Sequence, residues 1–143
     1  MELIDIIDRD HFLRQLYPAG LKSVAVVGFD VGLNHIILSH FILNLRVYSQ
    51  PAIDIPKYGK WLTDYDTVEI ELRNSYINDL SCHNWFNNSR KECSIDIKEI
   101  QEGRWSVKFY NEAEDWHLSF TVDSLIFNGC KVYMCSEEDY IPE

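Results

Sequence analysis

The sequence predicts an α+β fold that is mainly antiparallel β, with six to eight strands and one short N-terminal helix. Three observations predict it. Helical spacing of apolar residues is confined to the start of the chain, alternating apolar and polar residues recur in later segments, and no linker or repeat divides the sequence. With 143 residues, 46% of them apolar, residues 1–143 can form a single domain whose core needs no disulfide or metal ion.

The first third of the chain predicts a helix followed by a hairpin. Asp8 or Asp10 is available as the N-cap of the helix, and Pro18 follows its end. The apolar residues at helical spacing are Phe12, Leu13 and Leu16. Next, "KSVAVVGFDV" and "HIILSHFILNLRVYS" carry apolar residues on both faces, as central strands do, with a turn expected at residues 31–34.

The rest of the chain predicts a loop and then a series of half-buried strands. Two prolines and a glycine predict a loop over residues 50–59. The alternation in "DTVEIELRN", "CSIDIKEI", "RWSVKFY" and "WHLSFTV" then places one face of each strand on the core and the other in water. The dipeptide Asn128-Gly129 predicts a turn before a last strand, "CKVYM".

The charge of the chain argues against several classes of partner. Thirteen basic and 23 acidic residues give a net charge of −10, so we expect no direct binding of nucleic acid, which needs Lys and Arg at the phosphates. Residues 111–143 contain eight acids and one base and carry most of the excess. No signal peptide or membrane-spanning segment is apparent, and we expect a cytoplasmic protein without a membrane partner.

Cysteine and histidine spacing predicts neither a cofactor nor a metal site. Strand parity places Cys130 and Cys135 on opposite faces, so they cannot bond to each other, and Cys93 shares an apolar face with isoleucines. The neighbours Cys82 and His83 have no second ligand pair elsewhere. Four free thiols in a reducing compartment are expected.

No catalytic motif is present, and we expect neither an enzyme nor a small-molecule substrate. The chain lacks a Gly-x-Ser-x-Gly elbow, a Walker loop and a glycine-rich dinucleotide turn. Glu69 and Glu71 share a strand face and could act as an acid–base pair in sugar hydrolysis. A solvated strand face explains these two carboxylates more simply.

Two stretches, "IPKYGKWLTDYDTVEIELRNSYINDL" and "WHLSFTVDSLIFNGCKVY", resemble the immunity protein 50 family and similar small bacterial immunity proteins of polymorphic and contact-dependent growth inhibition toxin systems. The resemblance spans residues 21–140 and rests on hydrophobic patterns and a few aromatic residues. It implies an immunity-like domain over the chain, a non-enzymatic inhibitor that binds one cognate toxin domain. It provides no catalytic residues and does not identify the toxin.

The acidic C-terminal third predicts where such a partner would bind. Carboxylates can occupy the basic cleft of a nuclease toxin, and aromatic residues can anchor the contact. The residues expected to bind the toxin are Glu112, Glu114, Asp115, Trp116, Glu137, Glu138, Asp139 and Tyr140. A carbohydrate-binding β domain is the alternative, with exposed Trp85 and Trp116 as stacking platforms, and an uncharacterised small enzyme is the third.

Overall fold

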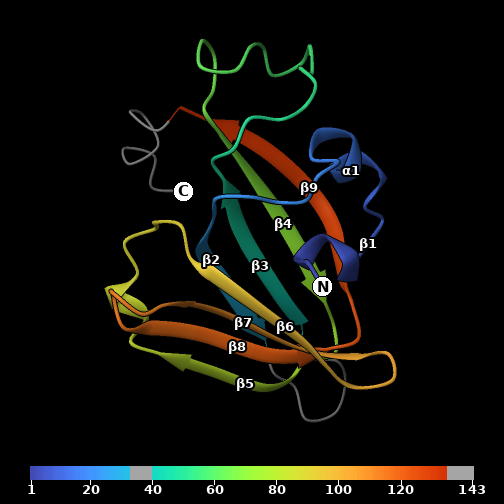
Figure 1. Cartoon of the computed structure of the whole chain (residues 1–143), viewed down its shortest axis with the longest axis vertical. Coiled ribbons are helices and arrows are strands. Elements are labelled where there is room, and N and C mark those ends of the chain that lie inside the picture. Colours follow the sequence, from blue (N-terminus) through green and yellow to red (C-terminus); the bar gives the residue numbers. More distant parts are fainter. Residues whose placement is uncertain (33–39, 135–143) are drawn as a thin grey trace.

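The protein consists of two β-sheets packed face to face, with a short helical segment at the N-terminus (Figure 1). The structure is a computed structural model, and it describes residues 1–32 and 40–134. Nine strands lie in these described residues, and all but one of the strand pairings are antiparallel. The fold is therefore mostly antiparallel β with little helix.

The two sheets differ in size and strand order. The five-stranded sheet has the order β1-β9-β4-β3-β2, with bounds β1 (Ile7–Asp8), β2 (Val24–Gly32), β3 (His40–Val47), β4 (Thr67–Asn74) and β9 (Leu125–Tyr133). The four-stranded sheet has the order β5-β8-β7-β6, with bounds β5 (Asn78–His83), β6 (Ser94–Gln101), β7 (Arg104–Asn111) and β8 (Trp116–Val122). Strands β2 and β3 form a hairpin, and β6, β7 and β8 form a meander.

One continuous core lies between the sheets. Alternate apolar residues of β3 and β4 face alternate apolar residues of β7 and β8, as strand parity requires. The Phe41 and Phe120 rings, one from each sheet, have their centroids 4.9 Å apart. Burial of large side chains on both facing surfaces provides the main stabilisation of the fold.

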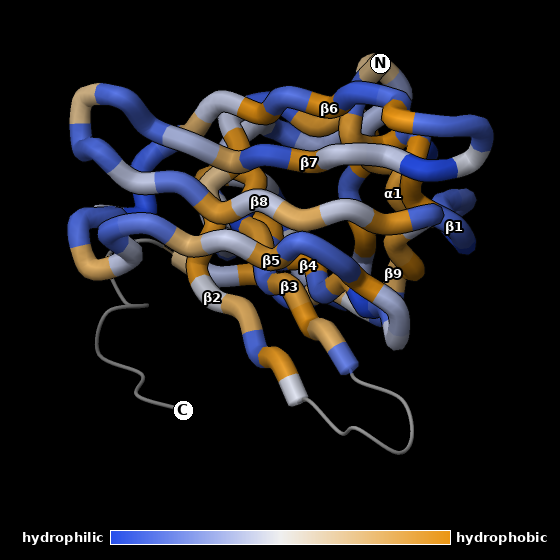
Figure 2. Tube along the Cα trace, turned by 90° about the horizontal axis from the view of Figure 1, so that it is seen from below, coloured by the Kyte–Doolittle hydropathy of each residue, from blue (hydrophilic) through white to orange (hydrophobic). Residues whose placement is uncertain are grey.

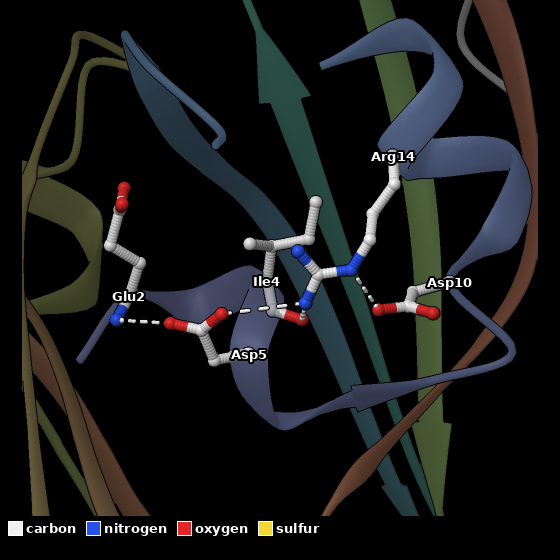
Figure 3. A network of polar contacts seen from close by, with 5 residues as sticks. All are labelled: Glu2, Ile4, Asp5, Asp10 and Arg14. Atoms are coloured by element: carbon white, nitrogen blue, oxygen red, sulfur yellow. Dashed lines mark hydrogen bonds and ion pairs between the residues drawn. The ribbon is translucent and has the colours of Figure 1, made fainter. Parts of the chain in front are cut away.

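The N-terminal segment covers the part of the core beside β9. It contains the 3₁₀ helix η1 (Leu3–Ile6), strand β1 and the helix α1 (His11–Leu16). Figure 3 shows that the Arg14 guanidinium fixes this segment by donating to Asp10 Oδ2 at 2.6 Å and to Asp5 Oδ1 at 3.3 Å. The hydrogen bond from the Glu2 backbone N–H, followed by Arg14, lowers the pKa of Asp5.

Several of the expected elements are confirmed. The helix α1 has Asp10 at its N-cap and ends at Leu16, and residues 50–59 contain no helix or strand. The alternation of apolar and polar residues correctly predicted which face of β4, β7 and β8 lies on the core. Strands β1 and β5 and the two short 3₁₀ helices, η1 and η2 (Trp85–Asn87), were not predicted, and the nine strands of the described residues exceed the expected six to eight.

Both expected hairpin turns are corrected by the structure. Val31 and Gly32, expected in a turn, belong to β2 and pair with β3; the remainder of that turn lies outside the described residues. Asn128-Gly129 is not a turn, because β9 runs unbroken through it. The register of β9 with β4 skips Asn128, which is the extra residue of a β-bulge.

The outward face of β4 is also less solvated than expected. Glu69 is buried, and its Oε1 accepts a hydrogen bond from Arg46 Nε of β3 at 2.9 Å. β4 is a central strand, so its outward residues are flanked by β3 on one side and β9 on the other. Glu71 is half-buried and only Arg73 is exposed. No helix within the described residues is long and apolar enough to cross a membrane.

Candidate functional site

The acids predicted to bind a partner lie in the turn between β7 and β8. Asn111 pairs with Trp116, so residues 112–115 form a four-residue hairpin loop. Asn111 Oδ1 accepts a hydrogen bond from the Glu114 backbone N–H at 3.1 Å, and Asp115 adopts a left-handed backbone conformation with φ of 55°. These features give the loop a defined shape, with Glu112 and Asp115 exposed.

Glu114 points toward the protein and holds a neighbouring segment in place. Its carboxylate accepts hydrogen bonds from the Ser89 hydroxyl and, at 3.3 Å, from Trp116 Nε1. The Ser89 hydroxyl is the main reason why the pKa of Glu114 is lowered. The Glu114 carbonyl also accepts from Asn87 Nδ2 at 2.9 Å. Glu114 therefore holds the neighbouring segment in place, whereas the side chains of Glu112 and Asp115 are exposed to solvent.

The braced segment follows β5 and contains the most exposed aromatic side chain among the described residues. Phe86 lies in η2 and is 98% exposed. The preceding Asn84 is left-handed, with φ of 49°, and donates from Nδ2 to Asp115 Oδ2 at 3.1 Å. Asn88 Nδ2 donates to the Val26 carbonyl at 2.8 Å. An apolar ring is therefore held in water by a turn that is tied to both sheets.

The turn at 112–115 and the segment at 84–89 lie side by side at one end of the four-stranded sheet (Figure 2). We name the surface formed by Phe86, Glu112 and Asp115 the acidic corner. Beside it, Tyr110 and His117 help to line a shallow hollow of about 250 Å³. The corner thus combines an exposed apolar side chain, two exposed carboxylates and a neighbouring hollow lined by polar residues.

Two histidines adjoin the acidic corner. The rings of His83 on β5 and His117 on β8 stack with centroids 5.4 Å apart, and His83 Nε2 is 3.6 Å from Asp115 Oδ1. Burial lowers the pKa of His117, and the charges of Lys108 and His83 lower it further. Within the described ranges, no group of three His, Cys, Asp or Glu side chains is arranged to hold a metal ion.

The structure changes the role expected for the tryptophans. Trp116 is 2% exposed and belongs to the core, so its ring is not available to stack on a ligand. Trp85 is half-buried, with edge contacts to Phe29 and Trp116 at 5.0 and 5.9 Å. These positions disfavour the stacking platform that a carbohydrate-binding surface requires. Glu137, Glu138, Asp139 and Tyr140 lie outside the described residues.

Glu69 and Glu71, the carboxylates considered for sugar hydrolysis, each interact with side chains of the same sheet. Glu69 is in the buried ion pair with Arg46, and Glu71 accepts hydrogen bonds from Arg73 and Asn128. They adjoin a hollow of about 230 Å³ on the outer face of the five-stranded sheet. Each carboxylate therefore has a cationic or amide partner that explains its position.

The cysteines in the described residues are free thiols with different surroundings. Cys82 is exposed on β5, whereas Cys93 packs against the core beside Ile95 and Ile97, as parity predicted. Burial raises the pKa of Cys93 to about 12. The hydroxyl of Tyr58 lies 3.3 Å from Cys130 Sγ, and this contact contributes most to raising the pKa of Tyr58 to about 12. Cys135 lies outside the described residues.

These surroundings predict selective alkylation. Iodoacetamide at pH 8 should modify Cys82 of the native protein much faster than Cys93, because Cys82 is exposed whereas Cys93 packs against the core, where burial raises its pKa to about 12 and leaves little of the thiolate nucleophile. Peptide mapping by mass spectrometry measures both rates, with urea-unfolded protein as the control in which the two residues should react alike. Equal rates in the native protein would contradict the burial of Cys93.

Comparison with known proteins does not assign a family to this chain. Searches of family models, of curated proteins and of solved structures find no match.

Proposed function

We propose that this protein is a cytoplasmic immunity protein that binds and neutralises a cognate bacterial toxin domain with a basic active-site cleft, such as a nuclease. The proposed mechanism is non-catalytic: the acidic corner occupies the cleft and blocks access of the substrate. The observation that carries the proposal is Phe86, which is 98% exposed on a braced turn beside the exposed carboxylates of Glu112 and Asp115. The resemblance of the sequence to immunity proteins supplies the class of partner.

An exposed phenylalanine held on an ordered turn is available for burial in a partner. Burying such a side chain in a pocket contributes roughly 2–3 kcal/mol. Residues that dominate interfaces are commonly anchors of this kind, surrounded by polar groups. The bonds from Asn84 to Asp115 and from Asn87 to Glu114 fix the turn before binding, so little conformational entropy is lost when a partner docks. Phe86 is thus suited to be the central anchor.

The carboxylates of the acidic corner are suited to guide association. Glu112 and Asp115 are exposed, and the chain as a whole carries a net charge of −10. A negative surface accelerates encounter with a basic cleft, and salt screens this attraction over about 10 Å at 0.1 M ionic strength. The corner therefore combines an anchor that slows dissociation with charges that speed association.

We expect Phe86→Ala to weaken binding at least about thirtyfold, mainly through faster dissociation, since loss of an interface anchor costs about 2 kcal/mol or more. The measurement uses surface plasmon resonance with the protein encoded by the neighbouring reading frame as the candidate toxin, together with growth of cells that co-express both. Leu62→Ala, at another exposed apolar residue, is the matched control and should bind as the wild type does.

A second variant in the same experiment tests the charges. Glu112→Lys combined with Asp115→Asn keeps the left-handed residue favourable and should slow association and reduce its salt dependence. Full protection and unchanged kinetics in both variants would remove the acidic corner as the site. Failure of the wild-type protein to bind or protect would remove the immunity function itself.

A further inference from the structure

Strand β6 is a sheet edge without a strand partner in the described residues. It is eight residues long, ends the four-stranded sheet, and pairs regularly with β7 from Ser94 to Glu99. On its other side, no strand within the described residues pairs with it. A long, regular edge offers a row of backbone donors and acceptors to another chain.

The remaining sheet edges are protected in ways that β6 is not. The start of the β2 edge is covered by a loop, where Cys93 N donates to the Val24 carbonyl and Asn88 Nδ2 to the Val26 carbonyl, both at 2.8 Å, and β2 has a register shift between Val26 and Gly28. Strand β5 has a register shift after Asn78, and β1 has only two residues. Short, irregular or covered edges resist pairing with other chains. Beyond its two residues paired with β1, strand β9 is interrupted by the bulge at Asn128, and its Cys130 carbonyl accepts a hydrogen bond from the Tyr58 hydroxyl at 3.2 Å. Strand β6 has a regular edge of greater length without a strand partner in the described residues.

The charges on β6 complement those of a second β6. Asp96 and Lys98 are exposed on its outward face, one residue on either side of Ile97. Antiparallel pairing of two copies about a two-fold axis at Ile97 places Asp96 of each copy opposite Lys98 of the other. Directly opposed residues of opposite charge stabilise an antiparallel pair, whereas like charges destabilise it.

The register centred on Ile97 is more favourable than the registers shifted along the strand from it. A shift by two residues in either direction brings Asp96 opposite Asp96, or Lys98 opposite Lys98. A shift that opposes Asp96 to Ile97 mismatches the faces of the two strands. Within one chain, Asp96 already pairs with Lys108 of β7. In the favoured register, Asp96 therefore lies between Lys108 of its own β7 and Lys98 of the second copy, so that acidic and basic residues alternate from strand to strand.

The inward face of β6 also favours a second copy. Ile95 and Ile97 are half-buried and pack against the core. They border a hollow of about 250 Å³, which residues 1–3, 21–24 and Cys93 also line. A paired strand would cover the free sides of these isoleucines and remove apolar surface from water.

We propose that β6 is a self-association edge, which pairs antiparallel with β6 of a second copy and joins the two four-stranded sheets into one continuous sheet. The interface is isologous, since each copy contributes the same strand and the same two charges. It lies on a different strand from Phe86 and the turn at 112–115, and Asp96 lines the hollow beside the acidic corner together with Glu112 and Asp115.

Charge swaps test this pairing. Asp96→Lys and Lys98→Asp each create two pairs of like charges across the axis and should weaken the dimer at least about tenfold. The double variant, Asp96→Lys with Lys98→Asp, restores opposite charges and should recover most of that loss. Asp8→Lys, at an exposed position on the other sheet, is the control for the change in net charge.

Sedimentation velocity across a range of concentrations measures the dimer, and circular dichroism confirms that each variant is folded. Weakening by both single variants with recovery in the double variant supports the pairing of β6. A wild-type protein that stays monomeric at every concentration would overturn the proposal. A dimer of equal strength in all variants would also overturn it, because the contact would then lie on another surface.

Discussion

Replacing Ile70 with Asp is expected to unfold the protein. Ile70 is 0% exposed on the inner face of β4, a central strand of the five-stranded sheet. The change removes apolar contacts and leaves a carboxylate in the core without a partner, for a total cost of about 4 kcal/mol or more. Small domains are stable by only about 5–15 kcal/mol, so the variant should lose most of its folded population.

Urea unfolding followed by circular dichroism measures this loss. Ile53→Asp introduces the same side chain at an exposed residue of the loop at 50–59 and should change the free energy of unfolding by less than about 1 kcal/mol. Glu71→Lys, on the opposite face of β4 from Ile70, should also remain folded. If Ile70→Asp were as stable as these two controls, the assignment of the inner face would be wrong.

The sequence was sufficient to predict strands whose two faces meet different environments. Val68, Ile70 and Leu72 alternate with polar residues because one face of β4 lies on the core. Strand β5 gives no such signal, because all six of its residues are exposed. It becomes a strand through its pairing with β8, which is a tertiary contact that no local pattern records.

The dipeptide Asn128-Gly129 shows how tertiary pairing overrides a local turn preference. In isolation these residues favour a hairpin turn. In the protein, β4 pairs with residues on both sides of Asn128, so the backbone continues as a strand and absorbs one extra residue in a bulge. The same local preference is thus satisfied by a bulge, and the sequence alone does not distinguish the two outcomes.

The acidic corner was predictable in part. An acidic segment between two alternating strands indicated the turn that carries Glu112 and Asp115. The inward orientation of Glu114 depends on Ser89, which is distant in sequence. Phe86 was missed because Trp85 and Phe86 are adjacent aromatic residues, and only the left-handed Asn84 and the 3₁₀ turn send one inward and the other into water.

The ion pair between Arg46 and Glu69 connects the adjacent central strands β3 and β4. Breaking this ion pair is expected to reduce the stability of the protein strongly. The two side chains are 9% and 10% exposed, and the guanidinium carbon of Arg46 lies 4.9 Å from the centre of the Tyr133 ring. Glu69→Leu is expected to lower the free energy of unfolding by about 3–5 kcal/mol, because the buried guanidinium loses its carboxylate partner. Glu71→Leu on the same face should cost about 1 kcal/mol, since Glu71 bonds the exposed Arg73.

The double variant Arg46→Met with Glu69→Leu distinguishes the effect of the unpaired buried charge on stability from the effect of side-chain packing. When both charges are removed together, no buried ion loses its partner, and apolar side chains of similar length fill the space. We expect the double variant to be at least as stable as Glu69→Leu alone and to recover most of the loss, which a double-mutant cycle from urea unfolding measures as a coupling energy. Strictly additive losses would show that Arg46 and Glu69 contribute independently, and that the burial of Glu69 reflects side-chain packing rather than the ion pair.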